Sequence, residues 1–300
     1  MYDPAHLPKK ILEIRQMHSW RRLSIFLAIA VIACLAVVMA SLASMAGQQT
    51  PAPAAAAYRA SRTKDGKPDL NGIWQAMNNA NWDLAPHDAG PPPLKIEAVI
   101  GALGAMPPGL GIVEGGVLPY LPEALTQRKA NFEKRFAEDP EAKCYLPGVP
   151  RMMYMPYPIQ IIQGTSHIAM VSEYKSALRD VYMDNHKKAP ADSWMGWSNG
   201  KWEGETLVID TTGFNDRSWF DRAGDFHSDA LHVVERITAA SPYHLNYEAT
   251  IEDPQVFSKP WKISMPLYRR MDKNTEILEY RCVEFSEELI YGKYRKVPLQ

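Results

Sequence analysis

The sequence predicts a mainly β protein: an antiparallel barrel or a strongly curved sheet with one or two peripheral helices, joined to a single N-terminal transmembrane helix. Three observations predict this fold class. A long uncharged segment lies near the N-terminus, short β-branched or alternating segments follow one another through the second half, and one segment in between has helical periodicity. With about ten short strands and few helices, a barrel or curved sheet is the favoured arrangement.

The composition is that of a globular protein with ample length for a hydrophobic core. The chain has 300 residues, of which 46% are hydrophobic and 22% are charged, and its net charge is −1. Residues 1–22 hold more basic than acidic side chains, so the remainder of the chain is acidic overall. A domain without a basic surface excess is not expected to bind nucleic acid.

The N-terminal segment carries the signals of a membrane anchor. Residues 23–46 contain no charged side chain and exceed the ~20 residues that a helix needs to cross a bilayer. Lys and Arg are frequent before this segment and absent after it until Arg59. The positive-inside rule therefore predicts a cytoplasmic head at 1–22, a single-pass anchor in a bacterial inner membrane at 23–46, and a periplasmic remainder. A cleaved signal peptide is the alternative, since residues 44–46 resemble a cleavage site.

The part after the anchor divides by composition. Residues 47–64 are predicted as a Pro/Ala-rich linker and residues 65–300 as the periplasmic β domain. Residues 76–150 form an insertion rich in Pro and Gly, which interrupt regular structure. Within the insertion, residues 122–138 are predicted as a helix, because Pro122 suits a first turn and three apolar residues share one face.

Strands are predicted at short intervals along the β domain. The candidates are residues 69–75, 158–163, 167–173, 178–184, 194–198, 206–211, 230–238, 244–252, 261–268 and 276–285. The segments 244–252 and 261–268 alternate apolar and polar residues, which is typical of an antiparallel sheet with one face in water. Asn199-Gly200 predicts a two-residue hairpin turn.

A polar loop precedes the strand predicted at 230–238, and polar loops between strands often carry function. If the protein is an enzyme, the candidate catalytic side chains are His227, Asp229, His232 and Arg236. In an extended strand His232 and Arg236 face one side and Glu235 the other, so too few ligands converge for a metal site. No metal or cofactor is therefore predicted, and the favoured interpretation is a loop whose polar groups satisfy one another.

Residues 196–200, Gly-Trp-Ser-Asn-Gly, match the Gly-x-Ser-x-Gly pattern of serine hydrolases. A nucleophile elbow needs a strand, a sharp turn and then a helix. Because a hairpin and another strand are expected to follow here, the match does not predict a nucleophile.

Two of the three cysteines, Cys144 and Cys282, lie beyond the apolar segment. The compartment outside the cytoplasmic membrane is oxidising, so a disulfide between them is predicted. A bridge that closes so long a loop contributes on the order of 4–5 kcal/mol in the chain-entropy model. The alternative is two buried free thiols.

Gly72-x-Trp74 in the first predicted strand resembles the lipocalin signature. In that family the Trp closes the base of an antiparallel barrel and often packs against an Arg from the last strand. The resemblance implies a lipocalin-like barrel, with Arg281 as the matching arginine.

Three further segments, WEGETLVIDTTGFND at 202–216, HSDALHVVER at 227–236 and EDPQVFSKPW at 252–261, resemble an uncharacterised family of exported bacterial β-rich proteins. The resemblance covers roughly residues 65–290. It implies an exported β domain and no particular chemistry.

These features favour a membrane-anchored periplasmic accessory subunit of an inner-membrane complex, photosynthetic or respiratory. Its expected partners are integral membrane protein subunits and the lipid bilayer, because one span with a large external domain is common among such subunits. The alternative is an anchored periplasmic enzyme or carrier that acts on a small apolar molecule in a lipocalin-like cavity.

Overall fold

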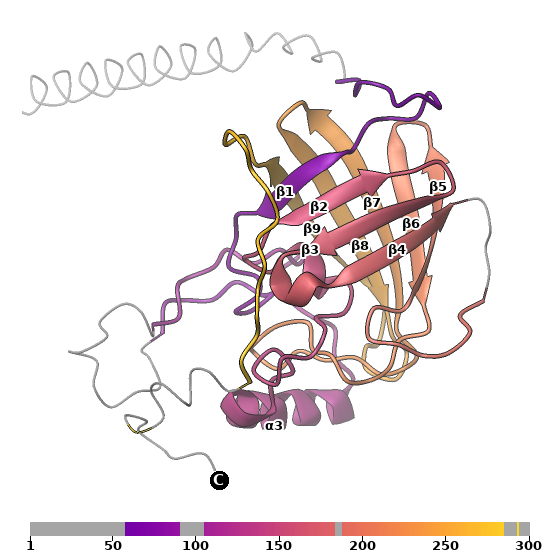
Figure 1. Ribbon diagram of the computed structural model, residues 1–300. Helices are drawn as coiled ribbons and strands as arrows, with labels where there is room; N and C mark the ends of the chain where they lie inside the picture. Colours follow the sequence, from indigo (N-terminus) through magenta and orange to yellow (C-terminus); the bar gives the residue numbers. More distant parts are fainter. Residues whose placement is uncertain (1–57, 91–104, 184–187, 285–292, 294–300) are drawn as a thin grey trace, which may run out of the picture. The chain divides into compact units, whose positions relative to one another are not determined.

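The computed structural model describes residues 58–90, 105–183, 188–284 and 293 (Figure 1). The predicted head, anchor and most of the linker fall within residues 1–57 and lie outside this range. In the described part of the chain, no helix is long and apolar enough to cross a membrane.

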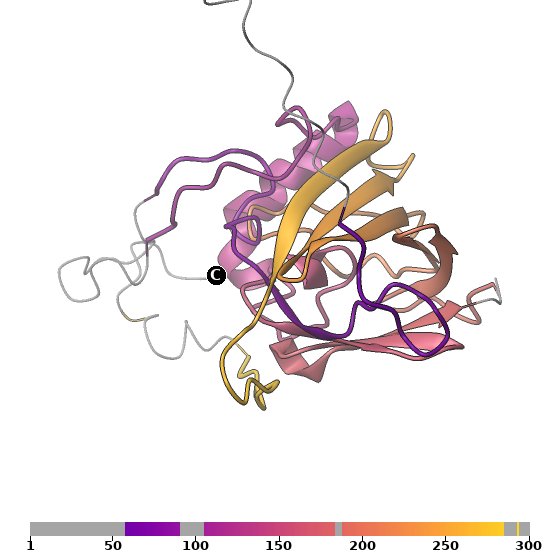
Figure 2. The same ribbon diagram turned by 90° about the horizontal axis from the view of Figure 1, so that it is seen from above.

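Nine strands form a closed barrel in which each strand pairs with the next and the last pairs with the first. They are β1 Gly72–Ala76, β2 Ile159–Gln163, β3 His167–Ser172, β4 Leu178–Met183, β5 Trp197–Glu203, β6 Thr206–Thr212, β7 His232–Ser241, β8 His244–Glu252 and β9 Trp261–Arg269. Strands β2–β4 and β7–β9 form opposite walls (Figure 2). The mainly β class predicted from the sequence is confirmed.

The barrel is mixed, whereas the sequence predicts antiparallel pairing throughout. Strands β4 and β5 run parallel, with Val181 opposite Ser198. Parallel neighbours need a crossover of about a dozen residues, and residues 184–196 supply a connection of that length. The chain can therefore return to the starting end of β4 before β5 begins.

The hairpin predicted at Asn199-Gly200 is wrong, because both residues lie inside β5. The turn to β6 comes later, at Gly204 and Glu205, where Gly204 has a φ of +62°. Gly200 is needed for a different reason: a Cβ atom there would lie 2.5 Å from the Met183 sulfur on the neighbouring strand. Close strand packing, which a local sequence pattern does not reveal, explains this glycine.

Trp74 joins the first strand to the last. Its indole Nε1 donates to the Leu70 carbonyl at 3.0 Å, and the Arg269 guanidinium of β9 lies 4.1 Å from the ring centroid. Arg269 also donates to the Asn71 carbonyl at 2.8 Å. Gly72 has a φ of +143°, which strains any side chain, and a Cβ there would also displace Arg269 Nη1, only 2.2 Å away, so glycine is favoured.

The expected arginine partner of Trp74 was the wrong one, since Arg281 is 85% exposed and pairs with Glu279. The strand predicted at 276–285 is also absent from its described part, 276–284. The reason is closure: β9 already pairs with β1, which leaves no free edge for a tenth strand.

Helix α3 spans Pro122–Glu138, as predicted, and lies beyond one end of the barrel (Figure 1). Hydrogen bonds attach it to two loops. The Leu121 amide donates to the Val256 carbonyl at 2.9 Å, and the Asn131 side chain donates to the Gly224 carbonyl at 3.1 Å. We refer to this end of the barrel, with the loops that contact α3, as the α3 end.

The barrel interior contains a buried ion pair. Arg179 of β4 and Glu235 of β7 are 3% and 0% exposed, and Arg179 Nη1 donates to Glu235 Oε1 at 3.0 Å. Because β5 and β6 lie between these strands, the pair crosses the interior, where Ser198 and Thr211 accept from the guanidinium at 2.9 Å each. The Tyr247 hydroxyl donates to Glu235 at 2.8 Å. Protein side chains therefore fill the barrel at this level.

The predicted disulfide is present. Cys144 and Cys282 are bonded, with their Cα atoms 5.8 Å apart and a sequence separation of 138. The bond ties the loop after α3 to the segment after β9, and it indicates an oxidising, extracytoplasmic location.

Reducing this disulfide should lower the free energy of unfolding by about 3–5 kcal/mol, because the unfolded chain regains the freedom of a long loop. Urea unfolding with and without dithiothreitol measures the change. The matched control is the double variant Cys144→Ser/Cys282→Ser, whose midpoint should not respond to dithiothreitol. Equal midpoints for the oxidised and reduced wild type would contradict the expectation.

Replacing Arg179 by Met should destabilise the fold by about 3–5 kcal/mol, because Glu235 would be left in the interior without its cation. Denaturant unfolding monitored by tryptophan fluorescence gives the value. Arg236→Met, on the solvent face of β7, is the control and should leave the midpoint almost unchanged, since its partner Glu203 is exposed. Similar losses for the two variants would refute the assigned role of the interior pair.

Candidate functional site

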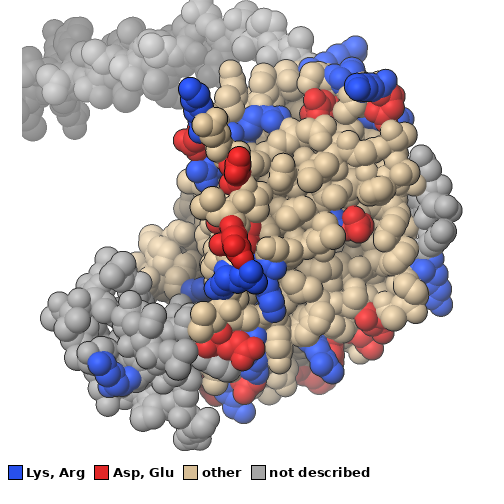
Figure 3. Space-filling model, viewed as in Figure 1, with Lys and Arg blue, Asp and Glu red and all other residues tan. Residues whose placement is uncertain are grey.

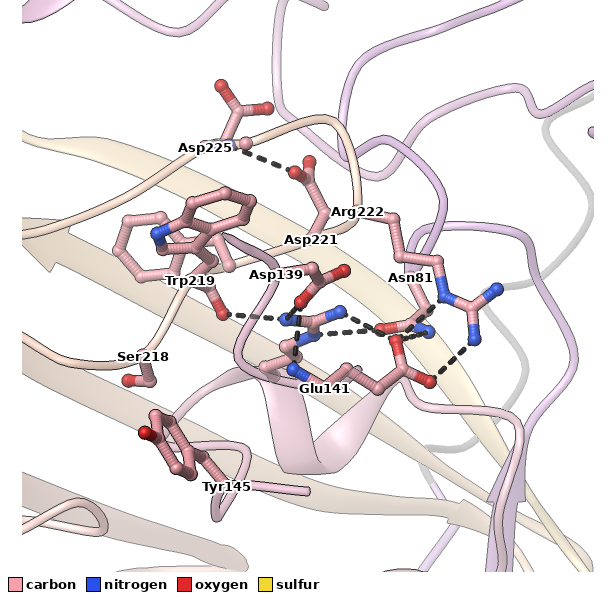
Figure 4. Close-up of polar contacts among 12 residues, drawn as sticks. Asn81, Asp139, Glu141, Tyr145, Ser218, Trp219, Asp221, Arg222 and Asp225 are labelled. Carbon is pink, nitrogen blue, oxygen red and sulfur yellow. Dashed lines mark hydrogen bonds and ion pairs between the residues drawn. The ribbon is translucent and has the colours of Figure 1, made fainter. Parts of the chain in front are cut away.

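The candidate site lies at the α3 end, where the segments 77–90, 139–157 and 213–231 meet. Helix α3 and the β8–β9 loop pack against the last of these segments. The segments bring together many of the buried charged residues of the described chain, and Figure 4 shows their contacts.

The structure does not bring the four candidate catalytic residues together. His227 is buried at 3% exposure, whereas Asp229 is exposed in the same loop. His232 and Arg236 lie on the outer face of β7, opposite to Glu235 as predicted. His232 contacts carboxylates on β6 and β8, and Arg236 contacts Glu203 at the end of β5. Only His227 belongs to the interior of the α3 end.

His227 forms a pair with Ser218, a residue that the sequence analysis did not select. Its Nδ1 lies 2.8 Å from the Ser228 carbonyl, which only accepts, so Nδ1 carries the proton. Burial lowers the pKa of His227 and favours the neutral ring. The unprotonated Nε2 then accepts from the Ser218 hydroxyl at 2.8 Å. This is the arrangement in which a histidine takes a proton from a serine nucleophile.

The segment that follows Cys144 covers Ser218. A Cβ at Gly148, where φ is +73°, would lie 2.4 Å from Ser218 Oγ, so the loop backbone packs directly on the hydroxyl. Nearby, the rings of Tyr145 and Trp194 lie 4.7 Å apart. Ser218 is only 2% exposed, and a substrate would reach it only if this segment moved.

A second cluster surrounds Arg151, which is 2% exposed. Its guanidinium contacts Asp139 at 3.2 Å and Glu141 at 2.8 Å, and Arg222 binds Glu141 through two bonds of 2.7 Å (Figure 4). Burial disfavours ionisation of Glu141, but Arg222 and Arg151 outweigh burial and lower its pKa to about 2. Two cations thus balance two carboxylates. These ion pairs hold the segments 139–157 and 213–231 together.

A third cluster contains Asp83, Asp221 and Asp225. Asp221 is fully buried, and its two oxygens accept the backbone N–H of Leu84 at 2.9 Å and of Asp225 at 3.1 Å. Burial and the neighbouring Asp225 raise the pKa of Asp221 well above its usual range. Arg128 of α3 contacts Asp225 at 3.1 Å and Asp83 at 3.6 Å. One guanidinium therefore faces three carboxyl groups.

The loop that carries Asp221, Asp225 and His227 stands out in the sequence as a polar segment, but the grouping of its residues does not. Arg151 and Asp83 lie far from that loop in the chain, in segments whose Pro and Gly content indicated only irregular structure. No local pattern distinguishes these residues from solvent-exposed ones.

No protein-family model matches this chain, and no significant match is found among curated proteins.

We expect His227 to stay neutral, with the proton on Nδ1, at pH 6. Because its pKa is lower in the folded than in the unfolded chain, His227 should reduce the free energy of unfolding as the pH falls below about 6.5 and have no such effect above it. Long-range ¹H–¹⁵N NMR reports the tautomer, and His232→Gln should leave that signal unchanged. A doubly protonated His227 ring at pH 6 would contradict the assignment.

Proposed function

We propose that the chain is an extracytoplasmic accessory subunit, held at the bilayer by its N-terminal apolar segment, that binds integral membrane protein subunits of an inner-membrane complex. Photosynthetic and respiratory assemblies are the candidate complexes. The observation that carries the proposal is a nearly uncharged outer surface on β2, β3 and β4.

This surface, the β2–β4 face, is made of the outward-pointing side chains of three strands and one aromatic neighbour on β5. Its residues are Gln160, Ile162, His167, Ala169, Val171, Leu178, Asp180, Tyr182 and Trp197. Asp180 is the one carboxylate among them. Figure 3 shows the face as mostly tan, with one small charged group within it and further charged residues along its margins.

Four apolar residues of this face lie together, and Asp180 and His167 separate them from an aromatic pair. Strand register puts Ile162 opposite Ala169 and Val171 opposite Leu178. Ile162 is 49% and Leu178 54% exposed. Tyr182 stacks on Trp197 outside the barrel, with ring centroids 4.4 Å apart. Contiguous exposed apolar surface is typical of protein-binding sites.

The length of the predicted tether supports a membrane-bound partner. The described domain starts at Tyr58, and the apolar segment at 23–46 is followed by only a short stretch before it. Fully extended, residues 47–57 reach about 40 Å at most. An anchor at 23–46 would therefore keep the β2–β4 face within reach of the external surface of a neighbouring membrane protein.

The carrier alternative has less support. A lipocalin-like cavity would have to share the barrel interior with the Arg179–Glu235 pair and the side chains bound to it. Removing those groups from their partners costs several kcal/mol. A ligand that occupies the middle of the barrel is therefore disfavoured.

An enzyme remains a second candidate because of the Ser218–His227 pair. The chemistry of such a pair is attack of the serine oxygen on an ester carbonyl, with the hydroxyl proton passing to His227 Nε2. A fluorophosphonate probe that labels the wild type but not Ser218→Ala would favour this function. Absence of labelling would favour the pair as internal bracing.

The β2–β4 face is tested by charge substitution. The double variant Val171→Lys/Leu178→Lys should lower co-purification with membrane-complex subunits by at least about tenfold, because two buried cations would lack partners in the interface. The readout is affinity purification in mild detergent followed by quantitative mass spectrometry. Asn246→Lys, an exposed outward change on β8, is the matched control and should co-purify normally.

Two outcomes would refute this proposal. One is a wild-type chain that always elutes alone. The other is a retained interaction in the double variant, which would move the binding surface elsewhere. Binding of the wild type to protein-free liposomes through this face would replace the protein partner with the bilayer.

A further inference from the structure

We propose that Asp83, Asp221 and Asp225 bind one divalent cation of the size of calcium at the α3 end. This inference does not depend on the proposed function. It rests on the spacing of three carboxylates, on an oxygen atom that lacks a partner, and on the local balance of charge.

The spacing suits a single coordination sphere. One carboxylate oxygen from each of Asp83, Asp221 and Asp225 lies within 4.8 Å of the other two. Calcium binds oxygen at about 2.3–2.6 Å, so two ligands on opposite sides of the ion are separated by roughly twice that distance. All three oxygens can therefore touch one such ion, while waters and carbonyl groups would complete the 6–8 ligands that calcium takes.

The second observation is a carboxylate oxygen without a donor. Asp225 is 1% exposed, and its Oδ1 accepts from the Tyr120 hydroxyl at 2.8 Å and from Arg128 Nε at 3.1 Å. Its Oδ2 is buried and has no hydrogen-bond partner among the described residues. The carboxyl groups of Asp221 and Asp225 also face one another, so a proton held between them would compete with an ion for this place. A buried anionic oxygen without a partner is costly, and a bound cation would remove that cost.

The charge balance favours a divalent ion over a proton. Among the described residues Arg128 is the cation that contacts this cluster, and it offsets one of the three negative charges that the fully ionised carboxyl groups would carry. Nearby Arg151 is already engaged by Asp139 and Glu141. One proton would leave one negative charge uncompensated, whereas a divalent cation would neutralise the cluster.

The site also has a route of entry and a suitable donor set. The Asp83 side chain is 17% exposed, whereas that of Asp225 is 2% exposed. An ion would enter from the Asp83 side. A set made only of carboxylate oxygens suits hard cations such as calcium and disfavours zinc or copper, which prefer nitrogen and sulfur.

The test is a calcium titration of the full chain in detergent after treatment with a chelator. Isothermal titration calorimetry should find one calcium site, and calcium should raise the Tm of the wild type. Asp225→Asn should weaken binding by at least about tenfold, the loss that even an outer partner of a metal ligand can cause. Asp216→Asn, an exposed acid in the same loop, is the matched control and should bind as the wild type does.

The variant Arg128→Gln distinguishes a cation-binding site from a purely structural ion pair. Removing the competing positive charge should tighten calcium binding, whereas loss of a merely structural ion pair would only lower the Tm. This variant and the wild-type titration keep the test decisive if Asp225→Asn fails to fold. The proposal is overturned if the wild type does not bind calcium at millimolar concentration, if magnesium binds as tightly, or if Asp216→Asn weakens binding as much as Asp225→Asn.

Discussion

Closure of the barrel is the constraint on which the rest of this structure depends. Strand β9 pairs with β1, and Arg269 locks the junction by packing on Trp74 and bonding to the Asn71 carbonyl. A closed barrel has no free strand edge, so every long segment outside it must pack on an outer face or across an end. The insertion with α3 and the long β6–β7 loop cover the α3 end, and the disulfide attaches the chain that follows β9 to the same region.

Several of the buried charged side chains in the described part of the chain are matched by an opposite charge. Arg179 is matched by Glu235 in the interior, and Arg151 and Arg222 are matched by Asp139 and Glu141 at the α3 end. Ions removed from water are tolerated when each has a partner with good geometry. The carboxylates around Asp225 break this balance, and that imbalance is the reason to look for a ligand there.

The features relevant to function are separated in space. The β2–β4 face lies on the outside of the barrel. The barrel interior is occupied by the Arg179–Glu235 network. The Ser218–His227 pair lies under the segment that follows Cys144. This separation favours a domain that offers its outer surface to a partner. It also means that partner binding on the β2–β4 face and cation binding at the α3 end can be tested independently of one another.

The sequence by itself determined the elements whose signals are local. The helix at Pro122–Glu138, most of the strands, and the inward and outward alternation around Glu235 follow from periodicity and turn chemistry. The disulfide followed from compartment and from the number of available thiols. Only the tertiary structure decided the parallel β4–β5 pair, the strand position of Gly200 and the choice of Arg269 as the partner of Trp74. The same holds for the meeting of Asp83 with Asp225, because such contacts join residues far apart in the chain and depend on how the barrel closes rather than on neighbouring side chains.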